Sequence, residues 1–209
     1  MVEPYLRRSP LAHKGLAARA AEAPAAAGVS LGESPHRCQI DLRGNPDDDS
    51  FMAAVASVIG IQLPVTANRA ATGQGLAALW LGPDEWLIIG PPGREKNLAA
   101  ALRQVLTGRH AAVVDLSEAR TVITIAGARA REMLQKGTPL DLHPRAFDAG
   151  HCAQTGLSRA NIILHQIDAT PRYDVYVQNS FADYLWNWME RAAEEYGLAV
   201  SGSGSVGRG

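Results

Sequence analysis

Two glycine patterns have the spacing of a nucleotide-binding loop. The run GQGLAA at residues 73–78 fits the form GxGxxA, and Gly202, Gly204 and Gly207 repeat a similar spacing. A phosphate loop needs a buried strand before it and a helix after it, because the helix N-terminus supplies positive charge. The first pattern lies between residues 67–72 and a predicted hairpin, and the second lies in a terminal Gly/Ser stretch. We interpret both as plain loop sequence.

A serine and three aspartates suggest other chemistry. Ser158, in the run GLSRA, approximates a nucleophile elbow. That elbow turns from a strand into a helix, whereas Ser158 falls between two strand-like runs, so a hairpin turn is favoured. Asp47, Asp48 and Asp49 could be a metal site, but consecutive helical residues point about 100° apart and do not converge on one ion. Negative charge at a helix N-terminus already accounts for them.

The histidines and cysteines form no catalytic or metal-binding pattern. The histidines are His13, His36, His110, His143, His151 and His165, and no two are four residues apart. His143 precedes a proline, and we interpret it as a hydrogen-bonded loop residue. Cys38 and Cys152 lack CxxC spacing, which excludes a zinc knuckle and a redox dithiol. We therefore predict no catalytic, cofactor-binding or metal-binding residue in this chain.

The first half of the chain alternates strands and helices. Strands are predicted at 38–42, 75–81, 86–89 and 111–115, with a turn at 82–84 that makes the middle two a hairpin. A helix opens at 47–49 with the apolar stripe Phe51, Val55, Val58 and Ile59. A second helix is predicted at 95–106, with Leu98, Leu102 and Val105 on one face and Gly108 after its end.

The second half resembles the first. Strands are predicted at 120–126, 152–157, 161–167 and 173–178, and a helix at 128–136 ends before Gly137. A long helix is predicted from Ser180 to Tyr196, with Asp183 placed as in a capping box. Two such units predict an α+β fold of two tandem split βαβ (ferredoxin-like) units, 36–116 and 117–200, with helices on their antiparallel sheets. The link at 116–119 is too short for independent motion.

The ends of the chain differ from its middle. Residues 1–35 hold few large apolar side chains, so we predict an N-terminal arm, with Leu6, Leu11 and Leu16 available to lie on another surface. Residues 201–209 are predicted to be a flexible tail. The C-terminal helix has an apolar arc of roughly 200°, against about 100° for an ordinary stripe. Either it is deeply buried in its own domain, or it also meets another subunit with Trp186 as an anchor.

Composition excludes several classes of function. Of the 209 residues, 46% are apolar and 20% charged, and the net charge is −1. These values are typical of a globular protein with a core. A near-neutral chain does not fit a general nucleic-acid binder. No apolar run approaches the roughly 18 residues that a membrane span needs, so we expect a cytoplasmic protein.

Six segments together resemble one known family. They are RSPL at 8–11, LGPDEWLI at 81–88, VDLSEARTVITIAG at 114–127, PLDLHPRAF at 139–147, GHCAQTGLSRANIIL at 150–164 and YDVYVQNSFADYLW at 173–186. In these runs the chain is similar to the gamma subunit of heterotetrameric sarcosine oxidase. The similarity covers nearly the whole chain, and the joint occurrence of PLDLHPRAF and GHCAQT is its most specific part.

The resemblance implies an accessory role in a flavoenzyme complex. The family enzyme oxidises the methyl group of sarcosine to give glycine and hydrogen peroxide, with the carbon released as formaldehyde or captured as 5,10-methylenetetrahydrofolate. FAD, FMN and NAD are then held by the alpha and beta subunits and zinc by the delta subunit. None is implied for this chain. The fold implied is that of the folate-binding part of the glycine-cleavage aminomethyltransferase.

Two other functions remain open at this point. The chain could be a stand-alone folate-dependent aminomethyltransferase-like protein, although 209 residues leave no room for the further barrel domain of that enzyme. It could also be a regulatory domain that binds a small molecule. Co-purification with a flavoprotein distinguishes the subunit from both alternatives, and a folate titration tests the first of them.

Overall fold

A five-stranded antiparallel sheet forms the first half of the chain. The computed structural model describes residues 7–24 and 26–202. The elements are β2 (Cys38–Arg43), α2 (Asp49–Ile59), β3 (Ala70–Gly73), β4 (Leu76–Gly82), β5 (Glu85–Gly90), α3 (Glu95–Val105) and β6 (Ala112–Asp115), and the strand order is β3-β4-β5-β2-β6. The four strands β4, β5, β2 and β6 have the order of a split βαβ unit, and β3 is added at the edge.

Local sequence explains the first helix of this unit. Asp48 is the N-cap of α2, and its carboxylate accepts hydrogen bonds from the backbone N–H groups of Ser50 at 2.9 Å and Phe51 at 3.2 Å. Such a cap satisfies donors that the first helical turn leaves without partners. Gly60, with φ 68°, ends the helix. The predicted stripe is confirmed at Phe51 and at the buried Val55 and Ile59, while Val58 is half-buried.

A six-stranded sheet forms the second half. Its elements are β7 (Arg120–Ala126), α4 (Ala130–Gln135), β8 (Cys152–Leu157), β9 (Ala160–Asp168), β10 (Arg172–Gln178), α5 (Asn179–Ala193), the 3₁₀ turn η3 (Glu194–Tyr196) and β11 (Leu198–Val200). Together with β1 (Val29–Glu33), the strand order is β11-β1-β7-β10-β9-β8. The predicted α+β fold of two tandem split βαβ units is therefore confirmed. All pairings are antiparallel except that of β1 with β11, which is parallel.

The N-terminal segment differs from the predicted arm. It contains the 3₁₀ turn η2 (Ala12–Lys14), helix α1 (Leu16–Ala21) and β1, and β1 takes the position beside β7 that β6 has beside β2. Leu11, Leu16, Val29 and Leu31 are buried in the core of the six-stranded sheet. The physical reason is that β7 would otherwise leave its backbone groups unpaired on one side. Leu6 lies outside the described residues.

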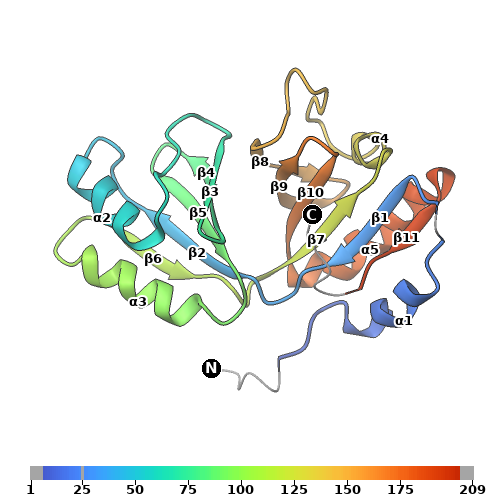
Figure 1. Cartoon of the computed structure of the whole chain (residues 1–209), viewed down its shortest axis with the longest axis horizontal. Coiled ribbons are helices and arrows are strands. Elements are labelled where there is room, and N and C mark those ends of the chain that lie inside the picture. The colour runs from blue at the N-terminus through green and yellow to red at the C-terminus, as the bar shows by residue number, and fades with distance from the viewer. Residues whose placement is uncertain (1–6, 25, 203–209) are drawn as a thin grey trace.

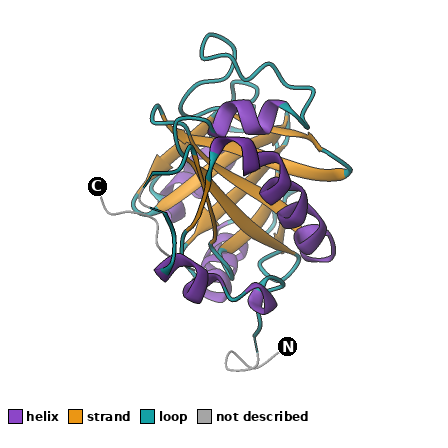
Figure 2. Cartoon of the chain, turned by 90° about the vertical axis from the view of Figure 1, so that its right-hand side faces the viewer, coloured by secondary structure: helices purple, strands orange, loops and turns teal. Residues whose placement is uncertain are grey.

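The two sheets face each other and the helices lie on their outer sides (Figure 1). Figure 2 shows helices crossing the strands of the six-stranded sheet on the side that faces the viewer. Leu79, Leu87 and Ile89 of the first sheet pack against Val122, Cys152, Ile163 and Tyr176 of the second. This shared core joins the units. At the start of the link, Leu116 N donates to the carbonyl of Gln39 on β2 at 2.8 Å. We propose a division at residue 116, with β1 added to the second unit.

Helix α5 also corrects two predictions. Gln178 is its N-cap, no side-chain cap is formed, and the carboxylate of Asp183 instead contacts Lys14 Nζ at 2.9 Å and His13 Nε2 at 2.8 Å. Trp186 is fully buried among its own core residues, because it lies on the face of α5 that packs on the sheet, so it is not an interface anchor. The wide apolar arc is thus mostly core, although Phe181 and Tyr184 are 42% and 37% exposed.

The C-terminal end is partly ordered against β1. The backbone N–H of Ser201 donates to the carbonyl of Leu31 at 2.8 Å, so the predicted flexible tail does not begin at residue 201. The remainder of that prediction, residues 203–209, lies outside the described residues. None of the helices in residues 7–24 and 26–202 is both long and apolar enough to cross a membrane.

Candidate functional site

The first glycine pattern and the GLSRA run around Ser158 both occur at hairpin turns. Gln74 and Gly75 have φ values of 51° and 75° and form the two-residue turn between β3 and β4. A strand, not a helix, follows this turn, so no helix dipole is available for a phosphate. Ser158 has φ 54° in the turn between β8 and β9, and its Oγ is 2.7 Å from the hydroxyl of Tyr184. The loop interpretations are confirmed for these two. Of the second glycine pattern, Gly204 and Gly207 lie outside the described residues.

The histidines near the second sheet contact loop groups. His143 accepts a hydrogen bond from the backbone N–H of Arg145 at 3.2 Å, as predicted for a loop histidine. His151 stacks on Phe147 with ring centroids 5.4 Å apart and lies beside Asp148. Across the described ranges, no three His, Cys, Asp or Glu side chains are grouped so as to hold a metal ion.

The two cysteines are buried free thiols. Burial, with a smaller contribution from Glu95, raises the pKa of Cys38 to about 12, and burial raises the pKa of Cys152 to about 11. The thiolate is the reactive form of cysteine. At neutral pH both side chains are therefore neutral packing groups rather than nucleophiles.

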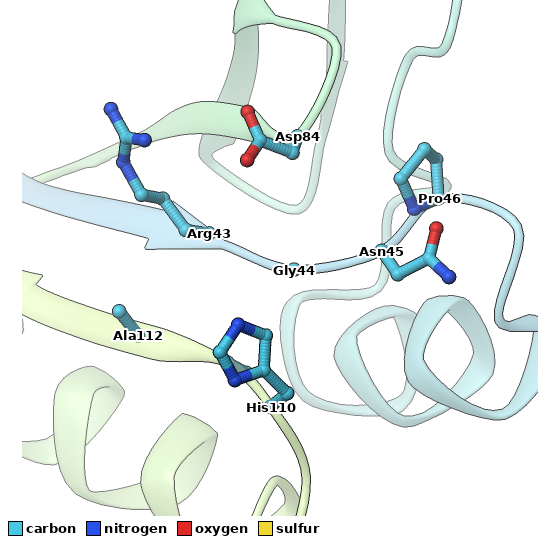
Figure 3. Close-up of a pocket in the computed structure, with 8 residues that line it drawn as sticks. Arg43, Gly44, Asn45, Pro46, Asp84, His110 and Ala112 are labelled. Carbon is cyan, nitrogen blue, oxygen red and sulfur yellow. The ribbon is translucent and has the colours of Figure 1, made fainter.

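One surface pocket lies where β2, the β4–β5 turn and the start of β6 meet (Figure 3). It has a volume of about 410 Å³ and is lined by Arg43, Gly44, Asn45, Pro46, Asp84, His110, Ala111 and Ala112. Arg43 is already paired with Glu85 at 2.6 Å. Figure 3 shows Asp84 and His110 on opposite sides of the segment 43–46, so they form no acid–base pair. This pocket offers little chemistry.

A second pocket lies between the two units. It has a volume of about 180 Å³. Arg37, His165, Asp174 and Tyr176 line it, together with Thr72, Gly75, Leu76, Ala77 and Ile167. We call it the inter-sheet pocket. The β3–β4 hairpin of the first unit forms one wall, and β9 and β10 of the second form the other.

Strand register brings three polar side chains of this pocket together. Asp174 of β10 pairs with His165 of β9, and Tyr176 follows Asp174 by two residues on the same face. Their exposed fractions are 7%, 2% and 1% for Asp174, His165 and Tyr176. Arg37 approaches from the segment before β2, and its Nε donates to the carbonyl of Gly90 at 3.1 Å. One pocket thus contains a guanidinium, a carboxyl, an imidazole and a phenol.

Burial controls the charges in the inter-sheet pocket. It lowers the pKa of His165 to about 4, with a smaller contribution from Arg37, so the imidazole is neutral at pH 7. It raises the pKa of Asp174, against which Arg37 and Arg172 act. It also raises the pKa of Tyr176 far above its ordinary value. Nδ1 of His165 is buried without a hydrogen-bond partner in the described structure.

Sequence reasoning did not identify this cluster. In the sequence, His165 is one of six histidines that form no pattern, and Asp174 lies in a predicted alternating strand. One signal in the sequence could have indicated the cluster: polar residues lie within two strand runs that are otherwise largely apolar. A buried polar group needs a partner, so such residues are expected to meet other polar groups. Arg37 carried no such signal, since it lies more than 120 positions before His165 in the chain.

Comparison with known structures identifies a related fold. The chain is similar to glycine cleavage system aminomethyltransferase T from Bartonella henselae, with a TM-score of 0.61 over 90% of this chain and 51% of that one. At 13% identity this likeness shows the fold alone. The implied fold is thereby confirmed.

Sequence similarity then identifies the family. The "Sarcosine oxidase, gamma subunit family" matches residues 43–195. The chain is 36% identical to sarcosine oxidase subunit gamma of Corynebacterium sp. (strain P-1), over 91% of this chain and 92% of that one. In the structure of heterotetrameric sarcosine oxidase from Corynebacterium sp. U-96, one chain matches with a TM-score of 0.82 and 33% identity, over 91% of this chain and 96% of that one. The chain belongs to the sarcosine oxidase gamma subunit family.

Proposed function

We propose that the chain is the accessory gamma subunit of a heterotetrameric sarcosine oxidase, which converts sarcosine to glycine and hydrogen peroxide. The main support is the match to a chain of such a heterotetramer, which covers 91% of this chain and 96% of that one at a TM-score of 0.82. The formaldehyde-forming 4-methylaminobutanoate oxidase of Paenarthrobacter nicotinovorans adds support. Its similarity to this chain spans 145 residues and only 16% of its own length. A related segment therefore occurs as a minor part of another N-methyl oxidase.

The partners and cofactors form a finer part of this proposal. The partners are alpha, beta and delta subunits, with FAD, FMN and NAD in the large subunits and zinc in the small one. The one-carbon product is formaldehyde or, with tetrahydrofolate, its methylene adduct. We place the complex in the cytoplasm, where thiols such as those of Cys38 and Cys152 stay reduced. The chain itself contributes contact surface to the complex and no catalytic group.

Co-expression with the three proposed partners tests this function. The expected result is one complex in gel filtration whose sarcosine-dependent peroxide production depends on the presence of this chain. The chain expressed alone should be colourless and inactive. Flavin absorbance that stays with the lone chain through gel filtration would contradict the accessory role. So would full assembly and activity of the other three subunits without it.

A folate titration of the lone chain distinguishes the alternative function. An aminomethyltransferase-like protein would bind tetrahydrofolate by itself, whereas an accessory subunit is expected not to. The comparisons do not favour this alternative, because the match to the aminomethyltransferase covers only about half of that enzyme.

A further inference from the structure

We infer that the inter-sheet pocket binds a small zwitterionic amino acid, with its carboxylate at Arg37 and its ammonium group at Asp174. The pocket contains one cationic and one anionic side chain. Such a site in the gamma chain is separate from the accessory role proposed above.

The two charges are available to a ligand. Within the described residues, no ion pair joins Arg37 to Asp174, although both line the same pocket. Among the described residues, the hydrogen bond that Asp174 accepts comes from the hydroxyl of Tyr176 and is long, at 3.5 Å. In the part of the chain that the structure describes, Arg37 donates its hydrogen bond from Nε, so its two terminal amino groups are available to a ligand. A carboxylate buried with such weak partners is costly, and a bound ammonium group offsets that cost.

The charge arrangement favours a zwitterion over other small molecules. An inorganic anion would pair with Arg37 but be repelled by Asp174. A simple amine would pair with Asp174 but be repelled by Arg37. An amino acid carries both charges, with one carbon between its ammonium and carboxylate groups. It can therefore pair with the two side chains at once, because opposite charges within a few ångströms attract strongly in a buried site.

The volume sets the size of the ligand. One water occupies about 30 Å³ of liquid. The 180 Å³ of the pocket therefore hold about six non-hydrogen atoms. Glycine and N-methylglycine (sarcosine) are of this size, and amino acids with long side chains are not. Tyr176 and the unpartnered Nδ1 of His165 provide further polar groups at the pocket wall.

Titration calorimetry of the full-length chain tests the site, with glycine and sarcosine as probes and acetate, methylammonium and leucine as comparisons. Binding of the two small zwitterions is expected, with clearly weaker binding of the three comparisons. Asp174→Asn and Arg37→Gln should each weaken binding by about tenfold or more, because each leaves one ligand charge without its partner. Asp84→Asn and Arg43→Gln, in the surface pocket, are the matched controls and should bind as the unchanged chain does.

Two results would overturn the inference: no binding of either zwitterion to the folded chain, or unchanged affinity in both pocket variants. If the lone chain or a variant does not fold, equilibrium dialysis of glycine against the co-purified complex replaces calorimetry. The number of glycines bound per complex should then fall by one in Asp174→Asn and stay constant in Asp84→Asn. An unchanged number in Asp174→Asn would also overturn it. Binding by a chain that forms no complex would support the pocket while contradicting the proposed function.

Discussion

At the scale of single residues, burial shifts the pKa values of two paired side chains in opposite directions. His165 on β9 is held neutral, and Asp174 opposite it on β10 has a raised pKa. Cys152 on β8 pairs with His165 from the other side and is also neutral at pH 7. Arg37 and Tyr176 complete the surroundings, and the nearby Arg37 opposes the effect of burial on the pKa of Asp174.

We predict that His165 makes the protein less stable as the pH falls from 6.5 to 4. In this range the unfolded chain binds a proton that the folded chain excludes, because the folded pKa is about 4. The contribution of His165 is about 3 kcal/mol over the whole interval. Asp174 acts in the opposite direction, since its raised folded pKa lets the folded chain bind a proton first.

Urea unfolding of the unchanged chain and of His165→Gln between pH 4 and 7 measures this term. The difference in free energy of unfolding between the two should shift in favour of the variant as the pH falls. His143→Gln, in an exposed loop, should show the pH dependence of the unchanged chain. A constant difference across the interval would show that His165 is protonated equally in both states.

At the scale of elements, helix α2 depends on a cap rather than on a charge cluster. Of the three adjacent aspartates, Asp48 accepts the two backbone hydrogen bonds at the helix start. Its pKa is lowered, first by the Ser50 hydroxyl and then by the Phe51 N–H. Position relative to the helix therefore distinguishes residues that look equivalent in sequence.

We predict that Asp48→Ala lowers the melting temperature by a few degrees, because two N–H groups lose their acceptor. Asp47→Ala, which leaves those two bonds intact, is the matched control and should change it less. Circular dichroism melting compares the two. Equal effects would mean that negative charge near the helix dipole, and not the cap, stabilises α2. Loss of a bound metal in either variant would contradict the structural role.

Helix α5 presents one face to the core and an aromatic edge to its surroundings. Trp186 and Met189 are fully buried, whereas Phe181 and Tyr184 are exposed and contact each other edge to face with centroids 6.4 Å apart. Aromatic side chains that stay exposed on a subunit are common contact points for partners.

We predict that Trp186→Ala lowers the free energy of unfolding by about 3–5 kcal/mol, because it leaves a large cavity in the core. Phe181→Ala should change stability little and should instead weaken co-elution with the partner subunits. Val65→Ala, at a residue that is 63% exposed, is the control for both measurements. A stable Trp186→Ala chain would contradict the core role, and unchanged co-elution of Phe181→Ala would remove α5 from the subunit contact.

At the scale of the whole molecule, the N-terminal segment stabilises the second unit. β1 pairs with both β7 and β11, and Arg19 forms an ion pair with Glu190 of α5 at 2.5 Å. Residues 7–24 and 26–35 therefore contact their own chain extensively, in addition to any surface they offer to a partner.

We predict that removal of residues 1–35 abolishes cooperative unfolding of the second unit. Loss of β1 exposes the backbone groups of β7 and the apolar faces that Leu11 and Leu31 cover. Leu11→Ala alone should cost about 2–5 kcal/mol. Circular dichroism and urea unfolding measure both, with Val65→Ala as control. A truncated chain that unfolds cooperatively and fails only to assemble would support the arm as a partner contact instead.

The sequence by itself determined most elements, the fold class and the family. Helices such as α2 and α3 and strands such as β5 and β7 were predictable because apolar residues recur at the period of each element. Strands β3, β1 and β11 were missed because each is short, and β1 and β11 also pair with segments far away in the chain. The pairing of β1 with β7, about 90 residues away, is not visible in local periodicity.

Only the tertiary structure decided what α5 buries and what the inter-sheet pocket contains. The wide apolar arc of α5 was compatible with a buried helix or with a subunit contact, and packing placed Trp186 in the core. The pocket needs Arg37 and residues more than 120 positions later to converge between two sheets. The charge, burial and pKa of each side chain in the pocket depend on which surfaces pack together, and the linear sequence pattern does not show that packing.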